Sequence, residues 1–153
     1  MKIIDGGVTA AKGFKAAGMH AGIKKGTKKD MAMIVSSAPC MAAGTFTTNL
    51  VKAAPVKWDQ HVVYEHGEAR AVVVNSGIAN ACTGAEGYGY CEETAKAAAE
   101  ALGIDKDEVL VASTGVIGKQ LPIDTIKKGV KDLSGLLLDT REAATLAAES
   151  IMT

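Results

Sequence analysis

Residues 69–77, with the sequence ARAVVVNSG, constrain the fold more than any other segment of the chain. Val72, Val73 and Val74 form an unbroken run of β-branched residues, which favours a strand. A strand that is apolar at consecutive positions is typical of a sheet that is covered on both faces. We therefore expect layers on each side of a central sheet, within a single domain that spans residues 1–153.

The patterns on either side of this strand predict further strands and three helices. Strand patterns cover residues 16–23, 30–37, 42–49, 52–59 and 107–113, and the fourth of these ends in a turn. Helical patterns cover residues 91–104, 121–132 and 141–152. Residues 24–29 (KKGTKK) are interpreted as a solvated turn and residues 75–90 as a glycine-rich loop. Strands come first and β-loop-α units follow, so the predicted fold class is α+β, a layered α/β sandwich.

The charge balance excludes several classes of function. The 17 basic and 17 acidic residues give a formal net charge of zero, so the chain offers no basic field that would attract nucleic acid. It contains no polybasic tract and no apolar stretch near the ~20 residues of a membrane span. The first residues lack the apolar core of a signal peptide. We expect a cytoplasmic protein with no nucleic-acid or membrane partner.

The cysteines and histidines do not form a metal-binding or redox pattern. The cysteines are Cys40, Cys82 and Cys91, and the histidines are His20, His61 and His66. An odd number of cysteines without framework spacing favours reduced thiols, and their Ala- and Gly-rich surroundings favour small core or loop residues. Cys82 and Cys91 are too far apart for a zinc knuckle, and the histidines are not at ligand spacing with the cysteines, so we expect no metal site.

The segment VLVASTGVIGKQLP, residues 109–122, is the first candidate for chemistry. An apolar strand runs into Ser113, Thr114 and Gly115, and a helix follows shortly afterwards. Glycine allows its backbone N–H to approach a ligand oxygen closely, and threonine adds a hydroxyl donor. Two convergent neutral donors suit the oxyanion that develops during acyl transfer. The alternative is a plain strand-to-helix turn, in which the threonine caps and the glycine bends the chain.

The loop after the central strand is the second candidate. Asn75, Ser76, Asn80 and Thr83 are crowded into a segment with two glycines. Loops at strand ends often carry function, and the glycines suggest a phosphate cradle. However, neither GxxxxGK[ST] nor GxGxxG is present, and Asx turns and caps account for the same residues.

An attacking group is missing from both candidates. The chain has no GxSxG motif, and no Ser-His-Asp or Cys-His set can be assembled from spacing. The residues therefore predict a pocket wall rich in hydrogen-bond donors, without a nucleophile of its own.

Several separated motifs resemble one known family. They are AGTFTTN at residues 43–49, VVNSGIANACTG at 73–84, STGVIGKQLP at 113–122 and AAESIMT at 147–153. In this order they are similar to the motifs of the ornithine acetyltransferases, the bifunctional glutamate N-acetyltransferases of arginine biosynthesis. The resemblance covers essentially the whole chain. It implies a fold like that of the aminopeptidases related to DmpA.

The resemblance also implies an activity. Members of the family are precursors that cut themselves between an alanine and a threonine, and the new N-terminal threonine of the β chain is the nucleophile. This threonine takes the acetyl group from N-acetylornithine and passes it to glutamate. The resemblance implies no cofactor, but some members use acetyl-CoA as donor, which makes acetyl-CoA a candidate co-substrate. The working unit of the family is an α2β2 heterotetramer.

By motif match, Thr114 and Gly115 occupy the family's oxyanion-hole positions, and Thr153 matches a substrate-contacting threonine. The family's Ala-Thr cleavage motif and the substrate-contacting lysine before it are not in this sequence. The resemblance therefore implies that this chain is the N-terminal α part of the enzyme. We expect it to be active only with the β chain, which carries the nucleophile.

Two other functions remain open. An N-terminal-nucleophile aminopeptidase of the same fold would hydrolyse a peptide and would need no acceptor. A small-molecule binding or regulatory domain would bind its ligand without a second chain.

Overall fold

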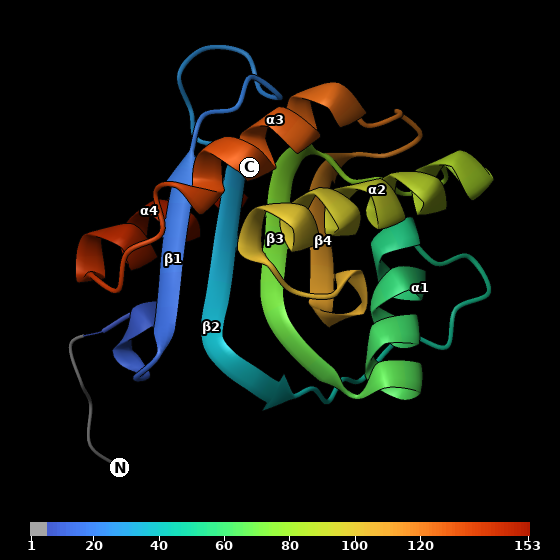
Figure 1. The fold of residues 1–153 in the computed structure, drawn as a ribbon. Coiled ribbons are helices and arrows are strands. Elements are labelled where there is room, and N and C mark those ends of the chain that lie inside the picture. Colours follow the sequence, from blue (N-terminus) through green and yellow to red (C-terminus); the bar gives the residue numbers. More distant parts are fainter. Residues whose placement is uncertain (1–5) are drawn as a thin grey trace.

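The computed structural model describes residues 6–153, which are built around a four-stranded sheet (Figure 1). The strands are β1 (Phe14–Met19), β2 (Met31–Met41), β3 (Glu68–Ile78) and β4 (Val109–Val116), side by side in sequence order. β2 is antiparallel to both β1 and β3, whereas β3 and β4 are parallel. Because β3 and β4 are parallel, their carboxyl ends lie at one edge of the sheet, the upper edge in Figure 1.

Four α-helices surround this sheet. They are α1 (Ala54–His61), α2 (Gly84–Leu102), α3 (Ile123–Ser134) and α4 (Arg141–Ile151). Short helical turns also occur at Val8–Ala10, Val62–His66 and Lys106–Glu108. The prediction of an α+β fold is confirmed. No helix within residues 6–153 is both long and apolar enough to cross a membrane.

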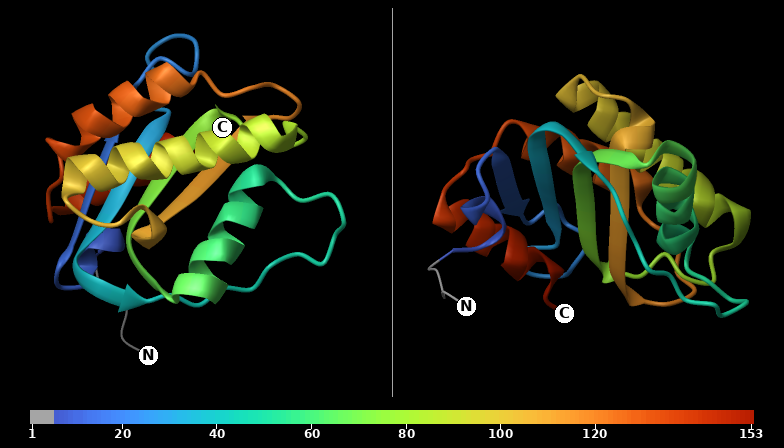
Figure 2. Two further views of the ribbon diagram at one scale, coloured as in Figure 1. Left: turned by 45° about the vertical axis from the view of Figure 1, so that its right-hand side comes forward. Right: turned by 90° about the horizontal axis from the view of Figure 1, so that it is seen from below.

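The helices lie on opposite faces of the sheet (Figure 2). α1, α2 and α3 cover one face, where Met31, Met33, Val73 and Val111 are buried in the main core. α4 packs on the other face against β1 and β2, through a smaller cluster that includes Ala147. On that second face no helix of residues 6–153 covers β4, so the expectation of a sheet covered on both faces is met only in part.

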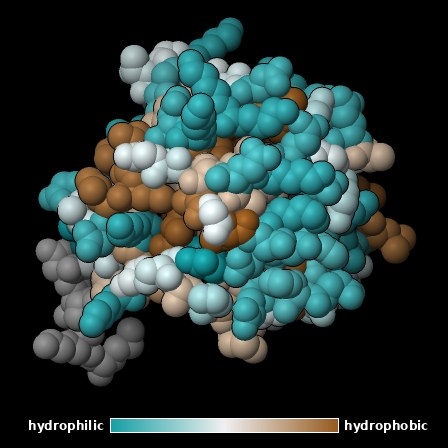
Figure 3. Space-filling model, in the orientation of Figure 1, coloured by the Kyte–Doolittle hydropathy of each residue, from teal (hydrophilic) through white to brown (hydrophobic). Residues whose placement is uncertain are grey.

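The outer surface is mainly hydrophilic over the helices in the view of Figure 3, whereas apolar residues gather on the side of β1. Leu136 and Leu138, which lie between α3 and α4, are both more than half exposed. Leu138 also pairs with Ala16 of β1, which places this connection beside the edge strand.

The prediction of a strand at residues 52–59 is wrong, because most of this segment belongs to α1. Pro55 lies in the first turn of the helix, where a proline needs no N–H partner. α1 lies along the outer edge of β4: the Trp58 indole donates to the Val109 carbonyl at 2.8 Å, and the Val111 N–H donates to the Asp59 carboxylate at 2.9 Å. These bonds use backbone groups at the edge of β4 that would otherwise be free to pair with another strand.

Two further predictions also need correction. Residues 42–49 form no strand, because the β2–β3 pairing ends at Met41 and no other strand lies beside them. Residues 75–90 are not one loop: β3 continues to Ile78 and α2 begins at Gly84. Gly87 is required inside this helix, since a Cβ there would lie 1.9 Å from the Thr83 hydroxyl. The glycines therefore reflect close packing and not only an open loop.

Candidate functional site

Thr114 and Gly115 lie at the carboxyl end of β4, at the upper edge of the sheet. They belong to the strand itself and not to a turn after it, because β4 stays paired with β3 as far as Val116. In this register Thr114 lies beside Ser76 and Gly115 beside Gly77. The sequence predicted a turn at these two residues after a strand that ends at Ser113, whereas the strand continues to Val116.

Both glycines of this pair have backbone conformations that other residues rarely adopt. The φ angle is +106° at Gly77 and +129° at Gly115. A Cβ on Gly115 would lie 2.3 Å from the carbonyl carbon of Gly77 and 2.5 Å from its oxygen. The two strand ends can approach this closely only because Gly115 lacks a side chain.

The Gly115 N–H points away from β3. The N–H of Val111 donates outward, to Asp59 of α1, while the carbonyl of Val116 accepts from Ala79, on the β3 side. Because N–H and C=O directions alternate along a strand, Gly115 has the same orientation as Val111. α1 covers that edge at Val109 and Val111, and Gly115 is exposed. Its N–H is therefore available to a group outside the sheet.

The Thr114 hydroxyl is a second available donor. The side chain is half-buried and makes no hydrogen bond to any part of the chain that the structure describes. Alternation along β4 puts it on the same face as Leu110, the face that carries α4 but no helix over β4. Thr114 and Gly115 thus place two neutral donors next to each other at the end of an exposed edge, an arrangement suited to a developing oxyanion.

The polar residues of the second candidate segment are used inside the protein. The Ser113 hydroxyl donates to the side-chain Oδ1 of Asn75 at 2.6 Å, and the Asn75 side-chain Nδ2 donates to the Ile78 backbone carbonyl at 2.9 Å. Asn80 is fully buried and accepts from Thr83 at 2.7 Å. These bonds connect β3, β4 and the start of α2. Hydrogen bonds within the protein therefore account for these polar residues better than a phosphate cradle does.

The end of α4 is tied to the same edge of the sheet. Ser76 is fully buried, and its hydroxyl donates to the Ser150 carbonyl at 2.5 Å. The Lys24 ammonium donates to the Met152 carbonyl. Since Ser76 is the register partner of Thr114, these bonds bring the segment that carries Thr153 to the edge that carries Thr114 and Gly115. All three predicted site residues therefore lie on one side of the molecule.

Sequence reasoning missed two residues that build this edge, Lys24 and Asp30. Residues 24–29 do form turns, as predicted, but Lys24 is half-buried rather than solvated. The fully buried Asp30 carboxylate accepts N–H bonds from Ala21, Ile23 and Lys24 at 2.6–2.8 Å. Lys29 is half-buried as well, whereas the other lysines of KKGTKK are exposed. Nothing in the spacing of the segment separates the half-buried lysines from the exposed ones, so no local signal would have identified Lys24.

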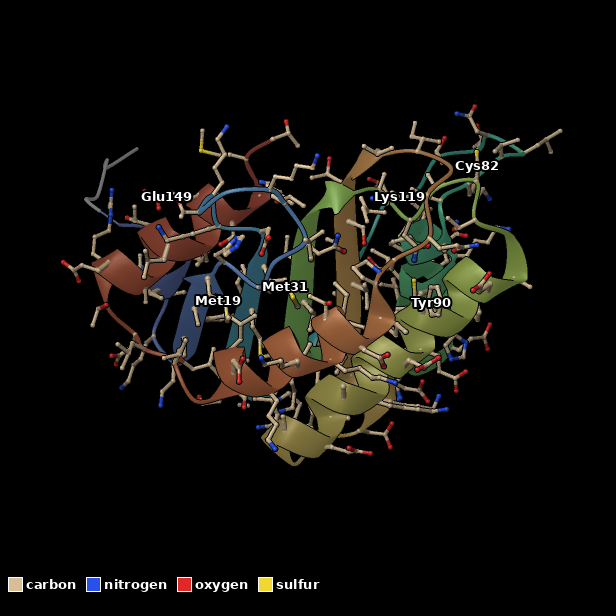
Figure 4. All side chains as sticks on the ribbon, turned by 90° about the horizontal axis from the view of Figure 1, so that it is seen from above. Met19, Met31, Cys82, Tyr90, Lys119 and Glu149 are labelled. Atoms are coloured by element: carbon tan, nitrogen blue, oxygen red, sulfur yellow. The ribbon has the colours of Figure 1, made fainter. Side chains whose placement is uncertain are left out.

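Cys91 does not supply a nucleophile at this edge. All three cysteines are free thiols. Burial, together with the negative charge of Asp59, raises the pKa of the Cys91 thiol to about 12, so it stays protonated and unreactive at neutral pH. Cys82 is exposed and lies with Lys119 on the β4 side of the strand ends, whereas Glu149 lies on α4 (Figure 4). Within residues 6–153 no three His, Cys, Asp or Glu side chains are grouped to hold a metal ion.

Residues 15–153 match the ArgJ family. The chain is 52% identical over 150 residues to the arginine biosynthesis bifunctional protein ArgJ of Gloeobacter violaceus, covering 98% of this chain and 36% of that protein. It is 51% identical over 155 residues to the protein of the same name from Symbiobacterium thermophilum, with 100% and 38% covered. The chain thus spans little more than a third of the length of these relatives.

Two solved structures are similar along the whole chain. One is the crystal structure of ArgJ from Bacillus halodurans, with a TM-score of 0.93 and 42% identity over 100% of this chain and 78% of that chain. The other is ornithine acetyltransferase complexed with ornithine from Mycobacterium tuberculosis, with a TM-score of 0.94 and 44% identity over 99% and 81%.

Proposed function

Since the chain belongs to the ArgJ family, we propose that it is the α part of a glutamate N-acetyltransferase of arginine biosynthesis. In this proposal the enzyme transfers the acetyl group from N-acetylornithine to glutamate, and acetyl-CoA is a second candidate donor. The names of the relatives and the ornithine bound by one similar structure support this choice of substrates. The three free thiols favour a cytoplasmic location.

The pair Thr114 and Gly115 is the single observation that carries the proposal. The nucleophile is the N-terminal threonine of a second chain, whose amine serves as its own base. Its hydroxyl attacks the acetyl carbonyl of N-acetylornithine, and the carbonyl oxygen becomes an oxyanion. Hydrogen bonds from the Thr114 hydroxyl and the Gly115 N–H stabilise this oxyanion. Collapse releases the α-nitrogen of ornithine, which takes up a proton, and leaves an acetyl ester on the threonine.

The second half of the reaction uses the same two donors. The α-amine of glutamate attacks the acetyl ester and forms another tetrahedral oxyanion at the same position. Collapse breaks the ester bond, returns a proton to the threonine oxygen and releases N-acetylglutamate. Because one geometry serves both halves, the chain needs only one oxyanion site.

The uncovered part of the sheet supports the presence of a second chain. In the part of the chain that the structure describes, no helix covers β4 on the face opposite α2, and Val72 and Leu110 are only half-buried there. They line an apolar hollow of about 240 Å³ together with Phe14, Ile34 and Val63. In the proposal, the β chain covers this face and carries its N-terminal threonine to Thr114, in an α2β2 unit.

The test starts from an intact mass spectrum of the native enzyme under denaturing conditions, followed by an acetyl-transfer assay. We expect a second chain that begins with threonine, and formation of N-acetylglutamate from N-acetylornithine and glutamate. Release of free acetate or amino acids without any acceptor would instead support the aminopeptidase. An active enzyme that contains no second chain with an N-terminal threonine would contradict the proposed nucleophile.

A further inference from the structure

A cavity of about 260 Å³ lies where the segment before α1 meets the start of α2. Its walls include Lys52, Lys57, Cys82 and Tyr88. The volume is close to the lower end of the range for small-molecule sites. The mechanism described above gives none of these wall residues a role.

The cavity carries positive charge that no acidic wall offsets. Lys52, just before α1, is half-buried, and Lys57, on α1, is exposed. Within residues 6–153, neither ammonium group makes a hydrogen bond or an ion pair. No acidic residue of the described chain lines the cavity. Two unpartnered cations at one cavity favour an anion there, and lysine is a common contact for phosphate.

The loop before α2 connects this cavity with the edge that carries the oxyanion donors. The Gly118 N–H donates to the Ala81 carbonyl at 2.8 Å, so the loop runs beside the residues that follow Gly115. The next residue of the loop, Cys82, is a wall of the cavity and lies on the β4 side of the strand ends (Figure 4). The cavity is therefore a neighbour of the oxyanion site, although neither Thr114 nor Gly115 lines it.

The start of α1 approaches the same edge. Ala54 is a wall of the cavity, and its N–H donates to the Asn80 carbonyl at 3.1 Å. Further along the helix, Asp59 accepts from the Val111 N–H of β4. The Gly115 N–H points to this side of β4, so the cavity and that donor lie on the same side of the strand.

The separation between the cavity and the oxyanion donors distinguishes two kinds of anion. In N-acetylornithine the α-carboxylate is only a few bonds from the acetyl carbon. In acetyl-CoA the whole pantetheine arm separates the phosphates from the acetyl carbon. A cationic cavity that lies beside the oxyanion donors, but is not lined by them, therefore matches the phosphates of acetyl-CoA better than a substrate carboxylate.

We propose that this cavity binds a phosphate group of acetyl-CoA, with Lys52 and Lys57 as its charged contacts. The inference rests on the proposed function, in which acetyl-CoA is a candidate donor. The pantetheine arm then extends to Thr114 and Gly115, where the thioester oxygen becomes the oxyanion. The threonine hydroxyl of the second chain attacks the thioester carbon, the C–S bond breaks, and the CoA sulfur takes up the hydroxyl proton. The acetyl ester that remains is the same one that N-acetylornithine forms.

Apolar side chains at the cavity suit the rest of this ligand. Leu50 and Val51 are wall residues, and they are 99% and 75% exposed. Tyr88 adds an aromatic ring that is half-buried. Acetyl-CoA carries a flat adenine base close to its phosphates, and contact with these side chains removes apolar surface from water.

The variants Lys52→Met and Lys57→Met test the proposal in the assembled enzyme, because methionine keeps most of the side-chain length and removes the charge. We expect KM for acetyl-CoA to rise about tenfold in Lys52→Met, the loss typical of one charge-assisted hydrogen bond. The rise should be smaller in Lys57→Met, whose exposed charge is screened by solvent. The KM for N-acetylornithine, which carries no phosphate, is the internal reference.

Lys128→Met is the matched control. Lys128 is exposed on α3 and is not a wall of this cavity. We expect its KM for acetyl-CoA to equal that of the wild type. A rise as large as that in Lys52→Met would mean that the loss of any surface charge has this effect, and the subsite would be wrong.

A second donor separates phosphate binding from support of the nearby backbone. S-acetylpantetheine has the thioester but no phosphate. Wild-type enzyme should prefer acetyl-CoA to S-acetylpantetheine, and the double variant with Lys52→Met and Lys57→Met should lose most of this preference. Lys52→Arg should retain it. If the double variant slows both donors by the same factor, the phosphate subsite is wrong.

A calorimetric titration with CoA gives a readout that does not depend on turnover. Weaker binding of CoA by Lys52→Met than by Lys128→Met supports the subsite even if acetyl transfer is absent and the proposed function fails. Equal binding by wild type and Lys52→Met overturns it. Inorganic phosphate is titrated in parallel: binding of inorganic phosphate without binding of CoA would assign the cavity to a free anion and also overturn the proposal.

Discussion

Gly77 and Gly115 lie opposite each other at the carboxyl ends of two parallel strands, so close that a Cβ on Gly115 would lie 2.3 Å from the carbonyl carbon of Gly77. The same strand register places the Thr114 hydroxyl beside the bond from Ser76 to the end of α4. The chemistry of the edge therefore depends on the absence of a side chain at Gly115 as much as on the presence of others.

Replacing Gly115 with alanine should displace the end of β4. The new Cβ meets backbone atoms that cannot rotate away, and the φ of +129° is strained for any L side chain. A misplacement near 1 Å in a catalytic group can cost about 100-fold in rate, so we expect kcat to fall by about that factor. Gly118→Ala is the control: its φ of +77° is also positive, but nothing lies within 4 Å of its Cβ. Similar rates for the two variants would show that the contact with Gly77 is unimportant.

Replacing Thr114 with alanine should remove one oxyanion donor. We expect kcat of the assembled enzyme to fall about 100- to 1,000-fold, with little change in stability, because the hydroxyl makes no hydrogen bond within the described chain. Steady-state kinetics and thermal unfolding measure the two effects. Thr114→Ser keeps the donor and should retain most of the activity. An unaltered turnover number in Thr114→Ala would rule out the oxyanion role.

Asp59 should make the stability of the protein depend on pH. Burial raises its pKa from 3.8 to about 6, against the opposing effect of the Val111 N–H bond. The folded state therefore binds the proton more tightly than the unfolded state. The stability that this provides is complete below about pH 4 and is lost as the pH rises through 6. At about 1.4 kcal/mol per pKa unit, the loss is about 2–3 kcal/mol.

The variant Asp59→Asn isolates this effect, because asparagine does not titrate but its carbonyl can still accept from Val111. We expect the free energy of unfolding of the wild type to fall relative to Asp59→Asn between pH 4 and 7, as measured by urea denaturation. Asp132→Asn, at an exposed position on α3, provides the comparison. A constant difference between wild type and Asp59→Asn across this range would contradict the raised pKa.

Asp30→Asn should loosen the β1–β2 connection. The carboxylate accepts three backbone N–H bonds, and an amide would turn a donor toward at least one of those groups. An unsatisfied buried donor and weaker bonds to the remaining groups should cost about 3 kcal/mol of unfolding free energy. Hydrogen exchange at Ala21, Ile23 and Lys24 should accelerate. Asp124→Asn, at a side chain that is 97% exposed, should change neither quantity.

Sequence reasoning predicted the correct element type for segments in which the apolar residues follow a clear strand or helix pattern. Residues 69–77 form a central strand, and residues 121–132 and 141–152 correspond closely to α3 and α4. Residues 52–59 and 42–49 were predicted wrongly, because proline and alternating small residues are compatible with more than one structure. Their conformation depends on β4, which gives α1 an edge to cover, and on the end of β2, which leaves residues 42–49 without a partner strand.

The sequence by itself determined the layered α+β class, and through its motifs it pointed to Thr114, Gly115 and Thr153 as candidate site residues. Only the tertiary structure decided that Gly77 faces Gly115, that Ser76 and Lys24 hold the end of α4 at the same edge, and that two lysines of KKGTKK are half-buried. The physical reason is that periodicity and motif chemistry are local properties of the chain. Contacts between residues 24, 77, 115 and 152 arise only when strand pairing brings distant segments together.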